Sequence, residues 1–174
     1  MRPATDLLVQ YATYHRDQRN ISSHFIGIPM IVCAIGTLLA HPAVALGGVT
    51  LTPAMAVFVL AALWYLSRDV VLGGATVLAS ALLFWIGHRL AEPGLAAGLG
   101  WGLGLFAVGW VIQFIGHYYE GRKPAFVDDL IGLLVGPMFV VAEALFALGW
   151  NPELQREIVR RAGPSHLRNL AQGA

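Results

Sequence analysis

Five apolar runs dominate this chain of 174 residues. They cover Phe25 to Ala40, Pro53 to Leu66, Val70 to Gly87, Leu95 to Gly116 and Leu130 to Leu148. A helix that crosses the hydrocarbon layer of a membrane needs about 20 residues, so the fourth run can cross and some others are short, tilted or incomplete. We therefore expect an all-α fold, a polytopic membrane helix bundle with about 4–5 apolar helices and an interfacial N-terminal helix.

The composition agrees with a lipid environment and excludes several classes of function. The chain is 57% hydrophobic and only 12% charged, whereas soluble domains carry about 25% charged residues. A formal net charge of +1 leaves no basic surplus for a phosphate backbone, which argues against nucleic-acid binding. Cys33 is the only cysteine, so a metal ion would have to be held by histidines and carboxylates.

We interpret residues 1–174 as a single integral membrane domain. Residues 1–24 form a polar interfacial lead-in without the apolar core of a secretory signal, residues 25–149 carry the membrane helices, and residues 150–174 form a basic tail. The tail is expected to be an amphipathic or frayed end on the cytoplasmic side. The Ala, Gly and Leu bias suggests a bacterial inner membrane as the location.

The distribution of Lys and Arg leaves one question of topology open. The lead-in, the connection 116–130 and the tail all carry basic residues, so all three favour the cytoplasmic face. Only one apolar run separates the last two. Either this run, with its Gly136-Pro137 pair, dips into the membrane and returns, or the tail faces the other side.

The first candidate site lies just before the first apolar run. His15 and His24 are nine residues apart, so on one straight helix they would point in opposite directions. A shared ligand requires a break between them, and Asn20, a favoured N-cap residue, is our predicted start of the membrane helix. The alternative is that both are interfacial histidines in a polar lead-in.

The second candidate site lies at the end of the fourth run. Gln113, His117 and Glu120 are spaced four and three residues apart, so they share one helix face. Imidazole and carboxylate are suitable ligands for Fe, Zn and Mn, and Gln113 could hold a metal-bound water or a substrate oxygen. The alternative is a polar helix end at the level of the lipid headgroups.

Glu143 is the one acid in the middle of the last apolar run. An ionisable residue inside a span is costly and is a functional candidate by default. We expect it to face substrate or to orient a ligand, paired for instance with Arg122 or with a ligating imidazole. It could equally be a protonated or paired structural acid.

Three other histidines are not assigned to the site. His41 and His166 have no partner pattern and are expected at the surface. His88 would lie at the opposite end of the fourth run from His117 and is left out of the ligand set. A common site for His24 and His117 requires an even number of membrane crossings between them.

With these residues identified, the chain resembles the membrane family of the fungal 2-hydroxy fatty acid dioxygenase. The matching pieces are Tyr14-His15, Asn20, His24, Gly27-Ile28-Pro29, Gly109-Trp110, Gln113 to His117, Glu120, Pro124-Ala125, Asp128, Glu143, Phe146 and Leu148-Gly149. They extend over nearly the whole chain and are specific in combination. In the family three residues separate the motif histidine from the glutamate, whereas here only Tyr118 and Tyr119 intervene, so Glu120 departs from the family spacing.

The resemblance implies an Fe(II)-dependent dioxygenase that uses O2 to shorten 2-hydroxy long-chain fatty acids by one carbon. His15, His24 and His117 would hold the iron, because they match both the spacing argument and the family motifs. The catalytic candidates are Glu120, Gln113, Glu143 and Asn20. Two other interpretations are a non-catalytic membrane scaffold or lipid-binding protein and, less well supported, a transporter.

Overall fold

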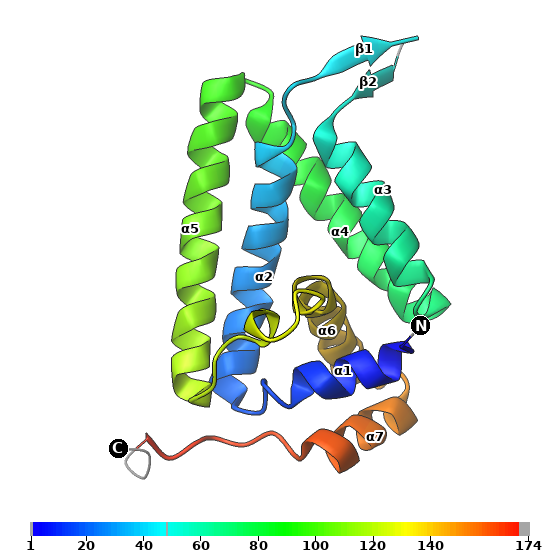
Figure 1. Ribbon diagram of the computed structural model, residues 1–174, viewed down its shortest axis with the longest axis vertical. Coiled ribbons are helices and arrows are strands. Elements are labelled where there is room, and N and C mark those ends of the chain that lie inside the picture. Colours follow the sequence, from blue (N-terminus) through cyan, green and yellow to red (C-terminus); the bar gives the residue numbers. More distant parts are fainter. Residues whose placement is uncertain (1, 48, 171–174) are drawn as a thin grey trace. The chain divides into compact units, whose positions relative to one another are not determined.

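The protein is almost entirely helical, which confirms the predicted all-α fold (Figure 1). The computed structural model describes residues 2–47 and 49–170. The helices are α1 (Ala4–Ala12), α2 (Gln18–Leu38), α3 (Pro53–Leu66), α4 (Val70–Ala91), α5 (Leu95–Glu120), α6 (Gly132–Ala147) and α7 (Pro152–Ala162), with a 3-10 turn η1 (Ala125–Val127). The strands β1 (Val44–Leu46) and β2 (Val49–Leu51) form a small antiparallel hairpin that the sequence analysis did not predict.

Within the part of the chain that the structure describes, three helices are long and apolar enough to cross a membrane, namely α2, α4 and α5. Helices α6 and α7 meet the same criterion only as a pair, which bends by 120° between them, and α3 is a shorter apolar helix. Counting the bent pair as one span gives up to four. The predicted polytopic membrane bundle is thus confirmed.

The chain divides into two compact units. One contains the residues up to Ile28 together with those from Val111 onward, and the other contains Pro29–Trp110. In the second unit α3 and α4 pack against each other as a close antiparallel pair. At the end of the turn between them, the Asp69 carboxylate caps α4 by accepting the N–H of Leu72 at 2.8 Å. The candidate site residues all belong to the first unit.

In the first unit the chain bends after α6, not at Gly136-Pro137 as the sequence analysis assumed. Helix α6 continues through Pro137, although a proline at this position lacks the N–H that would bond to the carbonyl of Leu133. The bend follows at Gly149, with φ of +83°, and at Asn151, which is left-handed and caps α7 by accepting the N–H of Leu154.

The bend returns the tail to the lead-in. The N–H of His166 donates to the carbonyl of Arg16 at 2.8 Å, and the N–H of Gln18 donates to the carbonyl of His166 at 2.9 Å. Of the two topologies left open above, this contact favours a last apolar segment that dips and returns.

Candidate metal centre

Three histidines from distant parts of the sequence meet inside the first unit. His15, His24 and His117 each offer a ring nitrogen within 4.8 Å of the other two. Their side chains are buried, with exposed fractions of 0%, 2% and 6%. His88 is exposed and belongs to the second unit.

The hydrogen bonds of two of these rings define where their protons lie. His15 Nδ1 is 2.7 Å from the carbonyl of Tyr11, and His24 Nδ1 is 2.8 Å from the carbonyl of Asn20. Since a carbonyl only accepts, each Nδ1 carries the proton of a neutral ring, and each Nε2 is left with a lone pair. The two Nε2 atoms face each other at 2.9 Å.

Two lone pairs at this distance repel each other unless a proton or a metal ion is bound between them. Two imidazole nitrogens bound at right angles to one ion, each about 2.1 Å from it, would be about 3.0 Å apart. The third ring has a free position as well, because His117 Nδ1 is buried without a hydrogen-bond partner among the residues that the structure describes. The donor set therefore fits a divalent metal ion with imidazole ligands.

Burial also keeps His15 in the form that binds metal. The loss of solvent around its ring, and then the neighbouring His24, hold the pKa of His15 well below its usual range. The ring is consequently neutral at physiological pH, as a metal ligand must be.

The break between the two N-terminal histidines exists, but Asp17 makes it rather than Asn20. Helix α1 ends at Ala12 and α2 begins at Gln18. The Asp17 carboxylate accepts the backbone N–H of Arg19 at 2.9 Å, which is the bond of an N-cap. Asp17 is as good a cap as asparagine and lies nearer to the end of α1, so Asn20 falls in the first turn of α2.

Glu120 is bonded to the loop that carries His15. Its carboxylate accepts the N–H of Arg16 at 3.0 Å, the N–H of Asp17 at 2.8 Å and the side-chain amide of Asn20 at 3.0 Å. The same amide donates to the carbonyl of Tyr14 at 3.1 Å. Both predicted site residues, Glu120 and Asn20, thus lie beside the imidazole cluster and hold the backbone around it.

A glycine allows the two histidine-bearing helices to come close. A Cβ atom on Gly116 would overlap the hydroxyl of Ser23 and would lie 2.6 Å from Asn20 Oδ1. A larger residue at this position would therefore displace the side chains of Ser23 and Asn20, which fill the space between α2 and α5. This contact places His24 near His117.

Gln113 and Asn20 each retain one unused polar atom. Gln113 is 4% exposed, one turn before His117 on α5. Its Nε2 atom and Asn20 Oδ1 are both buried and lack a hydrogen-bond partner among the described residues. Unsatisfied buried polar atoms are costly, and a donor and an acceptor in this unit are suited to bind an oxygen-rich ligand.

Glu143 is paired with Arg16, and not with Arg122 or a ligating imidazole. Arg16 Nη2 lies 3.8 Å from Glu143 Oε1, while Arg16 Nε donates to the carbonyl of His15 at 2.9 Å. Arg122 instead donates to the carbonyl of Thr13. Glu143 lines a small pocket together with Arg16, Ile21, Phe146, Gln155, Ile158, Val159 and Ser165.

Two aromatic residues that the sequence analysis did not select complete the surroundings of His15. The ring of Tyr11 stacks on the His15 ring at 4.0 Å, and Phe139 lies 5.6 Å from it. The spacing of four residues between Tyr11 and His15 places them on one face and could have indicated the stacking. Phe139 lies in a uniformly apolar run that gives no such signal.

Comparisons with known proteins agree with this picture. A family model described as 2-hydroxy-palmitic acid dioxygenase Mpo1-like matches residues 1–148. The 2-hydroxy-palmitic acid dioxygenase MPO1 of Saccharomyces cerevisiae is 32% identical over 147 residues, which cover 83% of this chain and 81% of the yeast protein. No solved structure matches the chain significantly. The chain belongs to the 2-hydroxy-palmitic acid dioxygenase Mpo1-like family.

Proposed function

We propose that this protein is a membrane-embedded, Fe(II)-dependent dioxygenase that removes one carbon from 2-hydroxy long-chain fatty acids. The observation that carries the proposal is the convergence of three buried imidazoles, two of which direct lone pairs at each other. Family membership supports the substrate class and the use of O2, because the yeast relative is named for this activity. We further propose a bacterial inner membrane as its location, on composition alone.

The proposed reaction balances with O2 as the only oxidant. The 2-hydroxy acid R–CH(OH)–COOH and O2 yield the shorter acid R–COOH, CO2 and water. The bond between C1 and C2 breaks, the two carbons together lose four electrons, and O2 is reduced by the same four. The reaction therefore needs no external reductant.

We assign the metal to His15, His24 and His117. When bound there, Fe(II) would supply the redox chemistry with O2 and coordination positions for the hydroxyl and carboxylate of the substrate. The three neutral rings add no charge, so the positive charge of the ion stays available to an anionic substrate. The carbonyls of Tyr11 and Asn20 hold the protons at Nδ1 and orient the rings.

We assign substrate contact to Gln113 and Asn20. The free Nε2 of Gln113 is a donor for a substrate carboxylate or hydroxyl oxygen, and the free Oδ1 of Asn20 accepts from a hydroxyl. The rings of Tyr11 and Phe139 limit the access of water to His15. The apolar side chains exposed on the membrane helices suit an acyl chain.

The proposal is tested with the full-length protein purified in mild detergent and loaded anaerobically with Fe(II). On addition of oxygen and 2-hydroxyhexadecanoic acid we expect the fatty acid one carbon shorter, with one CO2 released per O2 consumed. Hexadecanoic acid, which lacks the hydroxyl group, is the matched control and should not react. A protein that binds no iron and leaves the hydroxy acid unchanged would instead be a scaffold or lipid-binding protein.

A further inference from the structure

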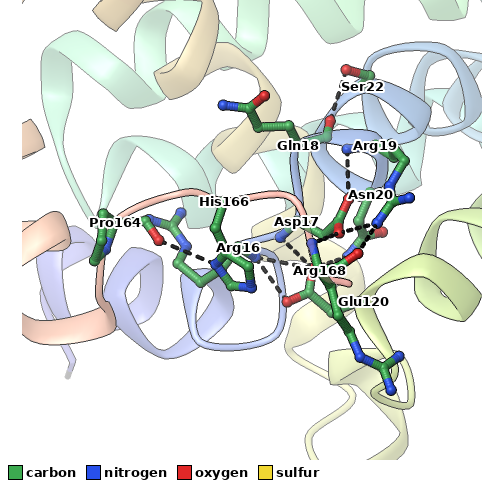
Figure 2. A network of polar contacts seen from close by, with 10 residues as sticks. All are labelled: Arg16, Asp17, Gln18, Arg19, Asn20, Ser22, Glu120, Pro164, His166 and Arg168. Atoms are coloured by element: carbon green, nitrogen blue, oxygen red, sulfur yellow. Dashed lines mark hydrogen bonds and ion pairs between the residues drawn. The ribbon is translucent and has the colours of Figure 1, made fainter. Parts of the chain in front are cut away.

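The chain after α7 lies along the loop that carries His15 (Figure 2). We call residues 163–168 the strap. It makes five hydrogen bonds to residues 16–19: His166 N–H to Arg16 O at 2.8 Å, Gln18 N–H to His166 O at 2.9 Å, Arg168 N–H to Asp17 Oδ2 at 2.8 Å, Arg19 Nη2 to Arg168 O at 2.8 Å, and Arg16 Nη1 to Gly163 O at 2.9 Å. The strap thus covers the break between α1 and α2.

Asp17 connects the strap to the helix that carries His24. Its side chain is completely buried. One oxygen, Oδ2, accepts the N–H of Arg168, while the other, Oδ1, caps α2 by accepting the N–H of Arg19. A displacement of the strap would remove one partner of the residue that sets where α2 begins.

The strap also reaches the end of the helix that carries His117. Gly121 follows the last residue of α5 and has a φ of +70°. A Cβ atom on Gly121 would overlap the guanidinium of Arg168, so the arginine side chain lies directly against this turn. A cation beside the C-terminal end of a helix also interacts favourably with its dipole.

The backbone beside His15 is therefore held from two sides. The N–H of Arg16 donates to Glu120, at the end of α5, and its carbonyl accepts from His166 of the strap. The residues matched by the family model end at 148, so the strap lies beyond the matched region. Glu120 lies inside the matched region. The strap adds a second hydrogen bond to the same backbone, at the carbonyl of Arg16.

We propose that the strap is a positioning element of the metal centre, which sets His15 against His24 and His117. This inference rests on the proposed metal site. A partner that orients a ligand without touching the ion typically contributes about 10- to 100-fold to metal affinity. We expect the loss of a strap hydrogen bond to have an effect of this size.

The test uses Co(II) as the probe metal and the full-length protein in detergent. His166→Pro and Arg168→Pro each delete one N–H that the strap donates to the loop. Leu167→Pro is the matched control, because no hydrogen bond from the Leu167 N–H is found among the described residues and its side chain is 63% exposed. Visible absorption reports both the affinity for Co(II) and the ligand geometry, and thermal unfolding of the metal-free protein reports folding.

We expect the two strap variants to bind Co(II) about 10- to 100-fold more weakly, with an altered absorption spectrum, and Leu167→Pro to bind like the wild type. Folded variants with wild-type affinity and spectrum would overturn the proposal, even if their thermal stability were lower. If one proline variant does not fold, Asp17→Asn tests the same contact. A wild-type protein that binds no Co(II) would overturn the metal centre itself, a result distinct from failure of the strap alone.

Discussion

The carboxylate of Glu120 accepts the backbone N–H of Asp17 at 2.8 Å, across 103 residues of sequence. Together with its bond to the N–H of Arg16, this contact fixes the loop behind His15 to the end of α5. Glu120 therefore holds the loop beside His15 in place, a role that does not require contact with the metal or the substrate.

Glu120→Gln is expected to weaken metal binding by about 10-fold without abolishing it, as an orienting partner does. The amide offers one acceptor oxygen to three donors, the N–H groups of Arg16 and Asp17 and the side-chain amide of Asn20, so at least one of them is left without a partner, at a cost of about 1–3 kcal/mol. Co(II) titration measures the effect, with Glu92→Gln at an exposed ion pair as the control. Unchanged affinity combined with lost turnover would show that Glu120 acts in the reaction itself.

Single substitution of His15, His24 or His117 by Ala is expected to remove bound iron and activity together. The loss of metal affinity in each variant should exceed the 10- to 100-fold that is typical when a residue hydrogen-bonded to a ligand is changed, since here a ligand itself is removed. His88→Ala and His166→Ala, at exposed positions, serve as controls and should keep both. Iron content by mass spectrometry is the measurement, and stoichiometric iron in any of the three variants would exclude that residue as a ligand.

Gln113→Leu separates binding of substrate from binding of metal. We expect full iron content and a KM for the hydroxy acid raised by roughly 10- to 100-fold, because a hydrogen bond to a charged group contributes about 1.5–3 kcal/mol. Thermal stability should not fall, since the Gln113 Nε2 atom is already without a partner among the described residues. Lower stability with an unchanged KM would make Gln113 a structural residue.

Glu143→Gln is expected to retain iron and to slow turnover by roughly 10- to 100-fold. The substitution keeps the volume but removes the charge that faces Arg16, whose Nε holds the carbonyl of His15. Single-turnover kinetics on the iron-loaded enzyme measures the change. Loss of iron would promote Glu143 to a ligand, and unchanged turnover would reduce it to a structural acid.

The depressed pKa of His15 predicts how the metal-free protein responds to acid. The folded state keeps this ring neutral, whereas the unfolded chain takes up a proton near its usual pKa of about 6.5. The contribution of His15 to stability is therefore complete above about pH 6.5 and falls as the pH drops below it. Denaturant unfolding at about pH 7.5 and 5.5 measures the loss, and His15→Gln should show a smaller one. Equal losses in both proteins would contradict the assignment.

The sequence was most informative where function depends on short spacings. The separations of four residues between Gln113 and His117, and of nine between His15 and His24, predicted the shared faces and the break in the helix. The cap at Asp17 was missed, since Asn20 is an equally good cap by type. The contacts of Glu120 with the His15 loop connect residues about a hundred positions apart, and spacing contains no information about such pairs.

The burial of the three imidazoles also has a kinetic consequence. No ring is more than 6% exposed, so we expect an ion bound among them to be shielded from solution. It can leave only when the loop or a helix end moves aside, and the rate of that opening limits its exchange. At high chelator concentration the rate of metal removal should therefore stop rising with chelator, and a protein loaded once should keep its ion through dilution.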